Sequence, residues 1–175
     1  MTDWTRGYTH VYTGDGKGKT TAALGLALRA AGAGLPVFIG QFVKGMAYSE
    51  LEALKRFDDL IAVRQFGLRC FVTEGPTDDD LCAARRGLEE SREALTGGRY
   101  RVVILDEAGV AVHLKLFGVE EVIALIDARP ENVELIVTGR RTPQPIIDRA
   151  DLVTEMREVK HYYNVGVEGR VGIEK

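Results

Sequence analysis

Residues 12–21 read Tyr-Thr-Gly-Asp-Gly-Lys-Gly-Lys-Thr-Thr, and this glycine-rich run constrains the fold more than any other segment. A short apolar stretch precedes it, and an alanine- and leucine-rich segment with helical spacing, residues 22–31, follows it. Phosphate-binding loops have this order of strand, glycine-rich turn, Gly-Lys-Thr and helix. The run therefore predicts an anion-binding loop that leads into a helix N-terminus.

Each residue type in this loop suits a polyphosphate. Glycines let successive backbone N–H groups turn toward one anion. We expect Lys19 and Lys17 to act on the phosphates as the catalytic cations, and the Thr20 hydroxyl to ligate Mg²⁺ or Mn²⁺. The alternative is an ordinary glycine-rich turn with solvated lysines. The candidate phosphate contacts are Gly14, Asp15, Gly16, Lys17, Gly18, Lys19, Thr20 and Thr21.

The spacing of the run departs from the regular phosphate loop, which has glycine, four residues and then Gly-Lys-Ser/Thr. Counting back from Gly18 places the first glycine at position 13, but Thr13 stands there and Gly14 comes one place later. The loop is thus one residue short. We expect it to hold a polyphosphate differently from the regular loop.

Length and composition restrict the class of protein. The 175 residues suit one compact domain, 1–175, of which residues 1–6 are expected to be mobile. A net charge of −3 gives no support to a nucleic-acid-binding surface, which would normally need a basic stripe. No apolar run reaches membrane-spanning length and no signal-peptide core is present, so we expect a cytoplasmic protein. Cys70 and Cys82 lack metal-ligand spacing, and a structural zinc is not expected.

Apolar runs alternate with helical patterns along the chain, which predicts an α/β fold with a mostly parallel central sheet and helices on both faces. The glycine- and proline-containing segment 67–77 is expected to be a functional loop, and residues 152–175 an irregular strand or hairpin end. Expected strands are residues 8–12, 36–43, 61–66, 102–105 and 133–137, and expected helices are residues 22–31, 78–95, 111–117, 119–128 and 143–148.

An acidic pair, Asp106 and Glu107, follows the most hydrophobic strand pattern in the chain. The carboxyl ends of parallel strands form the edge at which open α/β sheets bind ligands. A carboxylate there, the Thr20 hydroxyl and phosphate oxygens suit a hard cation. We expect Glu107 to ligate Mg²⁺, while Asp106 caps the helix that follows or supports the site. The alternative is that one acid serves only as the N-cap of the next helix.

The turn Thr138-Gly139-Arg140 follows the last buried strand pattern. Its backbone and the Arg140 guanidinium could both meet phosphate oxygens. An ordinary turn with a solvated arginine is an equally weighted alternative.

Several separate motifs, taken together, resemble the P-loop-type ATP:corrinoid adenosyltransferases, a family that converts cob(I)alamin and related corrinoids to their adenosyl forms. The combination of the short loop, the Gly-Gln-Phe-Val-Lys-Gly segment and the Val-Lys-His segment near the C-terminus is specific to it. The matches span nearly the whole chain. They are residues 12–21, 40–45, 103–107, 120–123, 128–130, 137–140, 150–151, 159–161, 166–167 and 172–174.

The resemblance implies a RecA-like P-loop fold, with ATP lying along the loop in a reversed sense. It implies that Arg29 reaches the nucleotide and that Gln41, Phe42 and Lys44 belong to the substrate site. It also implies ATP and a corrinoid as substrates, Mg²⁺, a homodimer and a flavin-based electron donor. The reaction would transfer the 5′-deoxyadenosyl group to Co(I) and release triphosphate.

Two features depart from the family pattern. Only about seven residues precede the first expected strand, so an N-terminal cover over the corrinoid is expected to be short or absent. Relatives place a Phe and a Trp after the third strand to displace the lower ligand of cobalt. Here the only tryptophan is Trp4, and Phe66 or Phe71 is the candidate substitute.

Two other functions share the same loop. A P-loop kinase or NTPase would use Lys19, Thr20 and Glu107 to move the terminal phosphoryl group. A non-catalytic module would bind nucleotide and corrinoid without reaction. The products separate the three, because a kinase or NTPase yields ADP, the transferase yields triphosphate, and the module yields neither.

Overall fold

A computed structural model describes residues 4–68 and 75–174. Its sheet has six strands in the order β3-β2-β4-β5-β1-β6, and every neighbouring pair is parallel. The strands are β1 (Thr9–Thr13), β2 (Val37–Phe42), β3 (Ile61–Phe66), β4 (Val102–Asp106), β5 (Glu134–Thr138) and β6 (Leu152–Glu155). The helices are α1 (Lys19–Gly32), α2 (Ser49–Leu54), α3 (Asp78–Thr96), α4 (Ala108–His113), α5 (Val119–Asp127) and α6 (Gln144–Ile147), with short 3-10 turns η1 (Lys55–Phe57) and η2 (Tyr162–Val165).

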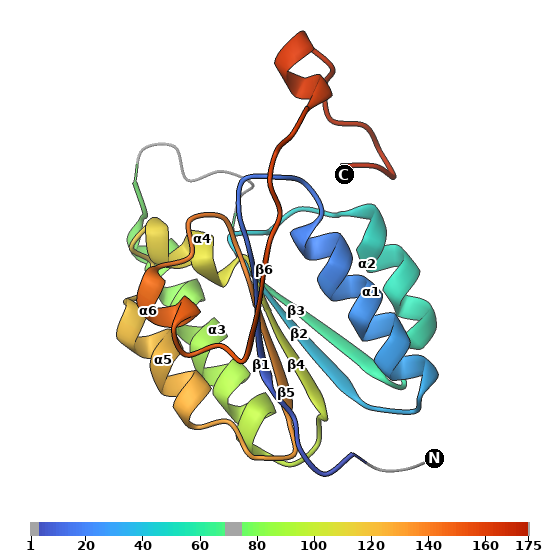
Figure 1. Cartoon of the computed structure of the whole chain (residues 1–175), viewed down its shortest axis with the longest axis vertical. Helices are drawn as coiled ribbons and strands as arrows, with labels where there is room; N and C mark the ends of the chain where they lie inside the picture. The colour runs from blue at the N-terminus through green and yellow to red at the C-terminus, as the bar shows by residue number, and fades with distance from the viewer. Residues whose placement is uncertain (1–3, 69–74, 175) are drawn as a thin grey trace.

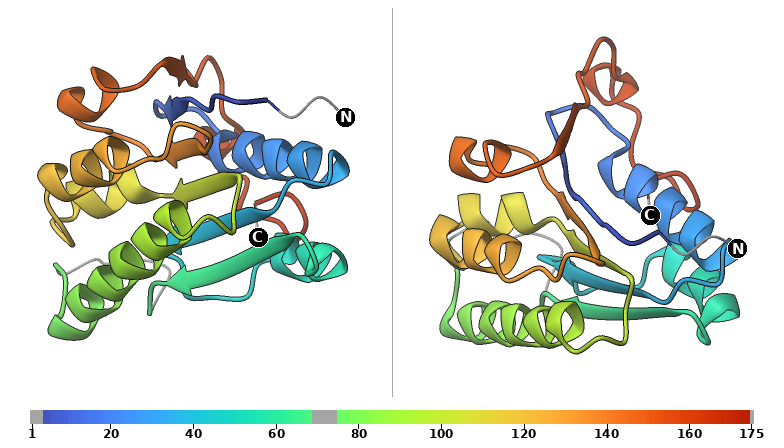
Figure 2. Two further views of the ribbon diagram at one scale, coloured as in Figure 1. Left: turned by 90° about the horizontal axis from the view of Figure 1, so that it is seen from below. Right: turned by 60° about the horizontal axis from the view of Figure 1, so that its bottom comes forward.

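Helices cover both faces of the sheet. Figure 1 shows α1 and α2 on one side and α3, α4 and α5 on the other, and Figure 2 shows the same layers from two further directions. Strand side chains alternate between the layers: Val103 and Leu105 pack toward α3–α5, while Val102 and Ile104 pack toward α1. Burial on both faces is why these strands read as continuous apolar runs.

The five expected strands are present within one or two residues of their expected ends. The described residues include no helix that is both long and apolar enough to cross a bilayer. Residues 1–3, part of the segment expected to be mobile, and 69–74, part of the expected functional loop, lie outside the described residues.

Two local expectations were wrong. Helix α1 begins at Lys19 rather than residue 22, directly after Gly18 with its φ of 117°. Helix α4 occupies Ala108–His113 rather than residues 111–117, because Glu107 (φ 60°) turns the chain immediately after β4 and Lys115 (φ 58°) follows the helix end. Of the two alternatives expected for the C-terminal region, the strand is confirmed: a parallel edge strand, β6, is followed by an extended segment with η2. Helix α2 was not anticipated.

A phosphate loop and an acidic cluster at the carboxyl edge of the sheet

The glycine-rich run forms the connection between β1 and α1, at the edge where all the parallel strands end. Gly14 and Gly18 have φ values of 92° and 117°, which residues with a Cβ rarely adopt. Gly18 is the N-cap of α1 and offers no side-chain acceptor to the first helical N–H groups. These N–H groups and the helix dipole therefore face the loop as donors for an anion.

Lys19 closes the loop from inside. Its Nζ donates to the carbonyl oxygens of Gly14, at 2.6 Å, and Gly16, at 2.7 Å. The side chain is buried, and burial is the main cause that lowers the pKa of Lys19, with the charge of Arg140 second. A bound phosphate would give this ammonium an anionic partner in place of two carbonyls.

Asp106, at the end of β4, collects donors from four other residues. Its Oδ1 accepts from the hydroxyls of Thr20, at 2.9 Å, and Thr138, at 2.8 Å. Its Oδ2 accepts from Lys44 Nζ, at 2.8 Å, and from Gln41 Nε2, at 3.3 Å. The carboxylate is 1% exposed, so these bonds satisfy a group that water does not reach. The predicted pairing of the loop with the acidic pair is present, through Asp106.

The geometry around Lys44 shows that this point favours a cation. Lys44 Nζ lies 2.8 Å from Asp106 Oδ2 and 3.3 Å from Thr20 Oγ1, and thus contacts both oxygens as one positive charge. A hydroxyl and a carboxylate are oxygen ligands of the kind that Mg²⁺ takes when phosphates complete its shell. The hydroxyl and the carboxylate therefore fit the expected metal in kind, and the binding of Mg²⁺ at this point stays a prediction.

Glu107 stands beside this cluster with a different environment. Burial and then the negative charge of Asp106 raise the pKa of Glu107, while Lys44, Lys19 and Arg140 oppose the rise. Its side chain makes no capping bond although the residue is the N-cap of α4, so the simple capping alternative does not account for it. Glu107 thus lies within electrostatic reach of the loop cations. Its role as a metal ligand stays a prediction.

Two arginines were predicted at the site, and the structure places them differently. Arg140 is exposed after β5 and acts electrostatically on both Lys19 and Glu107, so it belongs to the rim of the loop. Arg29 is exposed in the last turn of α1. Ten residues separate it from Lys19, which is about 15 Å along a helix axis. Its contact with nucleotide remains a prediction.

The aromatic side chains of β2 and β3 lie in the core. Phe42 is 0% and Phe66 is 3% exposed, with ring centroids 5.7 Å apart, and Phe42 meets Phe117 edge-on at 5.1 Å. The expectation that Phe42 or Phe66 faces the corrinoid is therefore not supported, because neighbouring rings enclose both. Phe71, the other candidate, lies outside the described residues.

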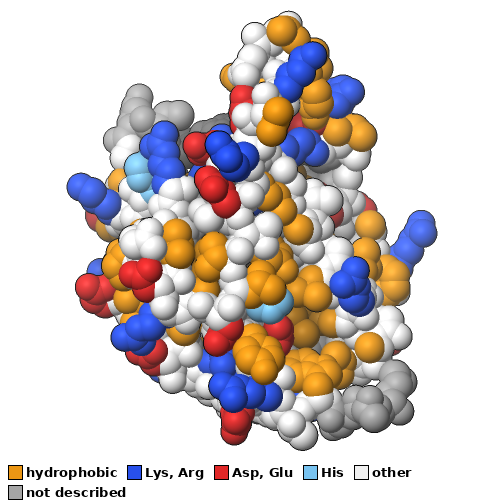
Figure 3. All heavy atoms as spheres, in the orientation of Figure 1, with side chains coloured by type: hydrophobic (Ala, Val, Ile, Leu, Met, Phe, Trp, Pro, Cys, Tyr) orange, Lys and Arg blue, Asp and Glu red, His pale blue; other side chains and the backbone are white. Residues whose placement is uncertain are grey.

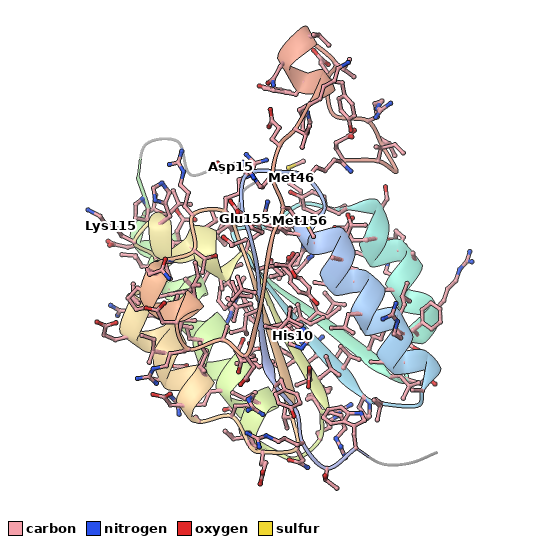
Figure 4. The ribbon with its side chains drawn as sticks, in the orientation of Figure 1. His10, Asp15, Met46, Lys115, Glu155 and Met156 are labelled. Carbon is pink, nitrogen blue, oxygen red and sulfur yellow. The ribbon has the colours of Figure 1, made fainter. Side chains whose placement is uncertain are left out.

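The sequence did not reveal that the C-terminal segment touches the loop. The Gly16 amide donates to the Met156 carbonyl at 2.7 Å, and the Met156 amide donates to the Thr13 carbonyl at 2.8 Å. Lys17 Nζ donates to the carbonyl of Ile173 at 3.1 Å. Figure 4 labels Met156 and Asp15, which both lie at this end of the sheet. A hollow of about 250 Å³ lies between the loop and residues 157–162. The loop and the C-terminal segment are far apart in sequence, and no local sequence pattern predicts that they are in contact.

Comparison with known proteins shows similarity over almost the whole chain. The profile of the family described as ATP:corrinoid adenosyltransferase BtuR/CobO/CobP matches residues 5–174. The corrinoid adenosyltransferase CobA of Salmonella typhimurium is 36% identical over 170 residues, covering 97% of this chain and 86% of that protein. The corrinoid adenosyltransferase of Escherichia coli is 35% identical over the same shares.

Two further comparisons concern length and fold. An uncharacterised protein of Nostoc is 39% identical over an alignment of 169 positions, which covers 89% of this chain but only 45% of that protein. The flagellar accessory protein FlaH of Methanocaldococcus jannaschii superposes with a TM-score of 0.64 at 12% identity, covering 86% of this chain and 71% of that one. The latter likeness concerns the fold alone and agrees with the predicted RecA-like architecture. By its match from residue 5 to residue 174 and by its relatives, the chain belongs to the ATP:corrinoid adenosyltransferase family.

Proposed function

We propose that this chain transfers the 5′-deoxyadenosyl group of ATP to the Co(I) of a corrinoid and releases inorganic triphosphate. The observation that carries the proposal is the joining of a short phosphate loop to a cation-binding pair, Thr20 and Asp106, in a chain that matches the family almost end to end. Corrinoid adenosyltransferase activity is what the family has in common.

In this reaction the cobalt supplies the electron pair. A bond forms between cobalt and the ribose C5′, while the bond from C5′ to the triphosphate oxygen breaks and its electrons leave with that oxygen. The nucleophile carries no proton, so the protein needs no general base. Its task is to position the two substrates and to stabilise the growing negative charge on the leaving group.

The loop residues suit that task. Lys19, Lys17 and the N–H groups at the start of α1 would contact triphosphate oxygens, with Arg140 at the rim. Mg²⁺, when bound, would neutralise phosphate charge without any proton transfer. Thr20 with Asp106 or Glu107 would hold it, and Lys44 would then be released from Asp106 to meet a phosphate oxygen.

Partners form a further part of the proposal. We propose a homodimer that acts in the cytoplasm and receives a reduced corrinoid from a flavoprotein, as the family resemblance implies. Apolar side chains on the C-terminal segment support a protein contact there, and Figure 3 shows this segment projecting from the body with hydrophobic and basic side chains. The most exposed of them are Val159, Tyr163, Val165 and Val171.

The test is to mix the protein with ATP, Mg²⁺ and chemically reduced cobalamin under anaerobic conditions. Formation of a light-sensitive adenosylcobalamin spectrum, with one triphosphate for each corrinoid adenosylated, is the expected result. ADP as the nucleotide product would instead indicate a kinase or NTPase. Stoichiometric corrinoid binding without adenosylation would indicate a non-catalytic binding module.

A further inference from the structure

The two lysines of the glycine-rich run have different environments. Lys19 Nζ donates to the carbonyl oxygens of Gly14 and Gly16, inside the loop. Lys17 Nζ donates instead to the carbonyl oxygen of Ile173, at 3.1 Å, in the C-terminal segment. The two ammonium groups therefore serve two neighbouring places, and Lys17 lies where the loop meets the C-terminal segment.

Lys17 lines the hollow of about 250 Å³ that lies between the loop and the C-terminal segment. We call this space the outer hollow, and its lining consists of Gly16, Lys17 and residues 157–162. The Gly16 amide donates to the Met156 carbonyl at 2.7 Å. A methyl group on Gly16 would stand 2.7 Å from that oxygen and 2.8 Å from the carbonyl carbon of Arg157. Real side chains do not approach so closely, so glycine at position 16 lets this wall of the hollow reach the loop.

Positive charge predominates in the outer hollow. Lys17, Arg157 and Lys160 are cationic, and Glu158 is the one acid in its lining. The Glu158 carboxylate accepts from the Asn164 side chain at 2.7 Å. In the described part of the chain, the side chains of Arg157 and Lys160 have neither a hydrogen bond nor an ion pair. Like charges gathered in one hollow repel one another, so a bound anion would stabilise them.

His161 adds a neutral donor to this lining. Its Nδ1 accepts from the Tyr163 amide at 3.1 Å, so the proton of the neutral ring lies on Nε2. Nε2 can then donate to a ligand. The hollow therefore offers several donors, most of them charged, which suits a ligand with several negatively charged oxygens.

Size and position narrow the class of ligand. At about 250 Å³ the hollow is smaller than the roughly 300–1,000 Å³ of sites for drug-sized molecules, so it suits a compact anion. An inorganic oligophosphate combines small volume with high charge. The hollow also adjoins the loop through Lys17, and the proposed reaction leaves inorganic triphosphate in that loop.

We propose that the outer hollow binds inorganic oligophosphate and receives the triphosphate as it leaves the loop after adenosyl transfer. The anion passes from the buried Lys19 to Lys17 and then to the exposed Arg157 and Lys160. At each stage a cation replaces the one that is lost, so the charged product does not leave the loop without a partner. Binding in the hollow needs no catalysis. The identity of the anion as the product rests on the proposed adenosyl transfer.

Calorimetric titration with inorganic triphosphate, without nucleotide, metal or corrinoid, tests the proposal. The double variant Arg157→Gln, Lys160→Gln should bind one triphosphate fewer per chain than the wild type. Each lost charged contact weakens binding about tenfold to a hundredfold, so the affinity of the hollow falls by about a hundredfold or more. The matched control is Lys55→Gln, Arg56→Gln in η1, which removes the same charge from exposed side chains and should bind as the wild type does. Equal numbers of triphosphates in the two double variants overturn the proposal.

A second titration asks whether the hollow is separate from the loop. Lys19→Ala disables the loop, yet it should still bind the triphosphate that Arg157→Gln, Lys160→Gln loses. A Lys19→Ala protein that is folded and binds none overturns the proposal, because the hollow would then be part of the loop site. If Lys19→Ala does not fold, wild type loaded with one ATP per chain replaces it, and that protein should bind one triphosphate.

The adenosylation assay separates this proposal from the proposed function. A wild type that does not adenosylate cobalamin, but loses a triphosphate when Arg157 and Lys160 are changed, contradicts the function and leaves the anion site standing. A wild type that adenosylates cobalamin while both double variants bind triphosphate alike contradicts the outer hollow alone.

Discussion

The hydroxyl of Thr20 donates a 2.9 Å hydrogen bond to the carboxylate of Asp106, across 86 residues of sequence. This bond joins the first turn of α1 to the end of β4. The sequence predicted a phosphate loop at the first place and an acidic pair at the second, as two separate motifs. Because Lys44 contacts both oxygens, the pair already holds a positive charge. The relationship makes Asp106 the residue through which loss of metal binding can be tested most directly.

Asp106→Asn should weaken the binding of Mg²⁺. The amide keeps the shape of the carboxylate but removes its charge, so the half-saturating Mg²⁺ concentration should rise about ten- to a hundredfold. The substitution also removes the nearer of the two carboxylates that Lys44 contacts, leaving Glu50 at 4.0 Å, and this should lower the free energy of unfolding by about 1–3 kcal/mol. A magnesium titration of adenosylation and urea unfolding measure the two effects. A wild-type magnesium titration curve would exclude Asp106 from the metal site.

Glu107→Gln separates the second carboxylate from the first. If Glu107 is a ligand, the variant should need more Mg²⁺ for half-maximal activity while Thr20 and Asp106 stay bonded. The same titration measures it, with Glu120→Gln on the surface of α5 as a control. An unchanged requirement in Glu107→Gln together with a raised one in Asp106→Asn would assign the ligand role to Asp106 alone.

The environment of Glu107 also predicts a dependence of stability on pH. Burial and the charge of Asp106 raise the pKa of Glu107 above its usual 4.5, so the folded protein disfavours the ionised form. The protonated carboxyl group of Glu107 therefore contributes to the stability of the folded protein. This contribution is fully present below pH 4.5 and is lost as the pH rises through the raised pKa. Over that window the wild type should lose unfolding free energy relative to Glu107→Gln. Urea unfolding of both proteins without nucleotide, from pH 4.5 upward, measures the difference; parallel curves would contradict it.

Lys19→Ala should remove turnover and weaken ATP binding. The ammonium bonds to the carbonyl oxygens of Gly14 and Gly16, inside the loop that we propose holds the phosphates. Removing a group that stabilises charge in the transition state typically lowers kcat by a factor of about a hundred or more. Lys55→Ala is the control, because Lys55 is exposed and pairs only with Glu52 in the described contacts. Wild-type turnover in Lys19→Ala would overturn the assignment of the loop.

Gly87→Ala tests the packing that removes Phe42 and Phe66 from the substrate surface. A methyl on Gly87 would stand 2.7 Å from atoms of both rings. Overpacking of this kind costs about 1–3 kcal/mol of unfolding free energy. The same change at Gly25, which faces open space in α1, should instead add up to about 1 kcal/mol. Urea unfolding measures the stability of both variants. Equal free energies of unfolding would mean that the Phe42 and Phe66 rings move to admit the methyl group without loss of stability.

Much of this arrangement could be predicted from local sequence. The strands are short apolar runs, and Gly-Lys-Thr after the first of them locates the loop, since both signals lie within one segment. The hydrogen-bond partners of Asp106 could not be predicted from local sequence. Whether Asp106 or Glu107 turns toward Thr20 depends on the left-handed backbone of Glu107, which no sequence pattern indicates for a glutamate.

The aromatic residues and the C-terminal segment illustrate what local patterns miss. Phe42 and Phe66 belong to conspicuous motifs, yet their rings pack in the core against Gly87 on α3. Met156 touches the loop because β6 pairs with β1, a long-range pairing that periodicity does not encode. In both cases a distant element decides the outcome.

The position of β1 has a consequence for synthesis of the chain. The first strand made is inserted between β5 and β6, the last two made, so it finds both neighbours only after residue 155 has emerged. Until then at least one edge of β1 is unpaired, and the loop that follows it lacks its contact with Met156. Chains that end before β6 should therefore bind ATP more weakly, and nucleotide binding would report that β6 has been made and paired.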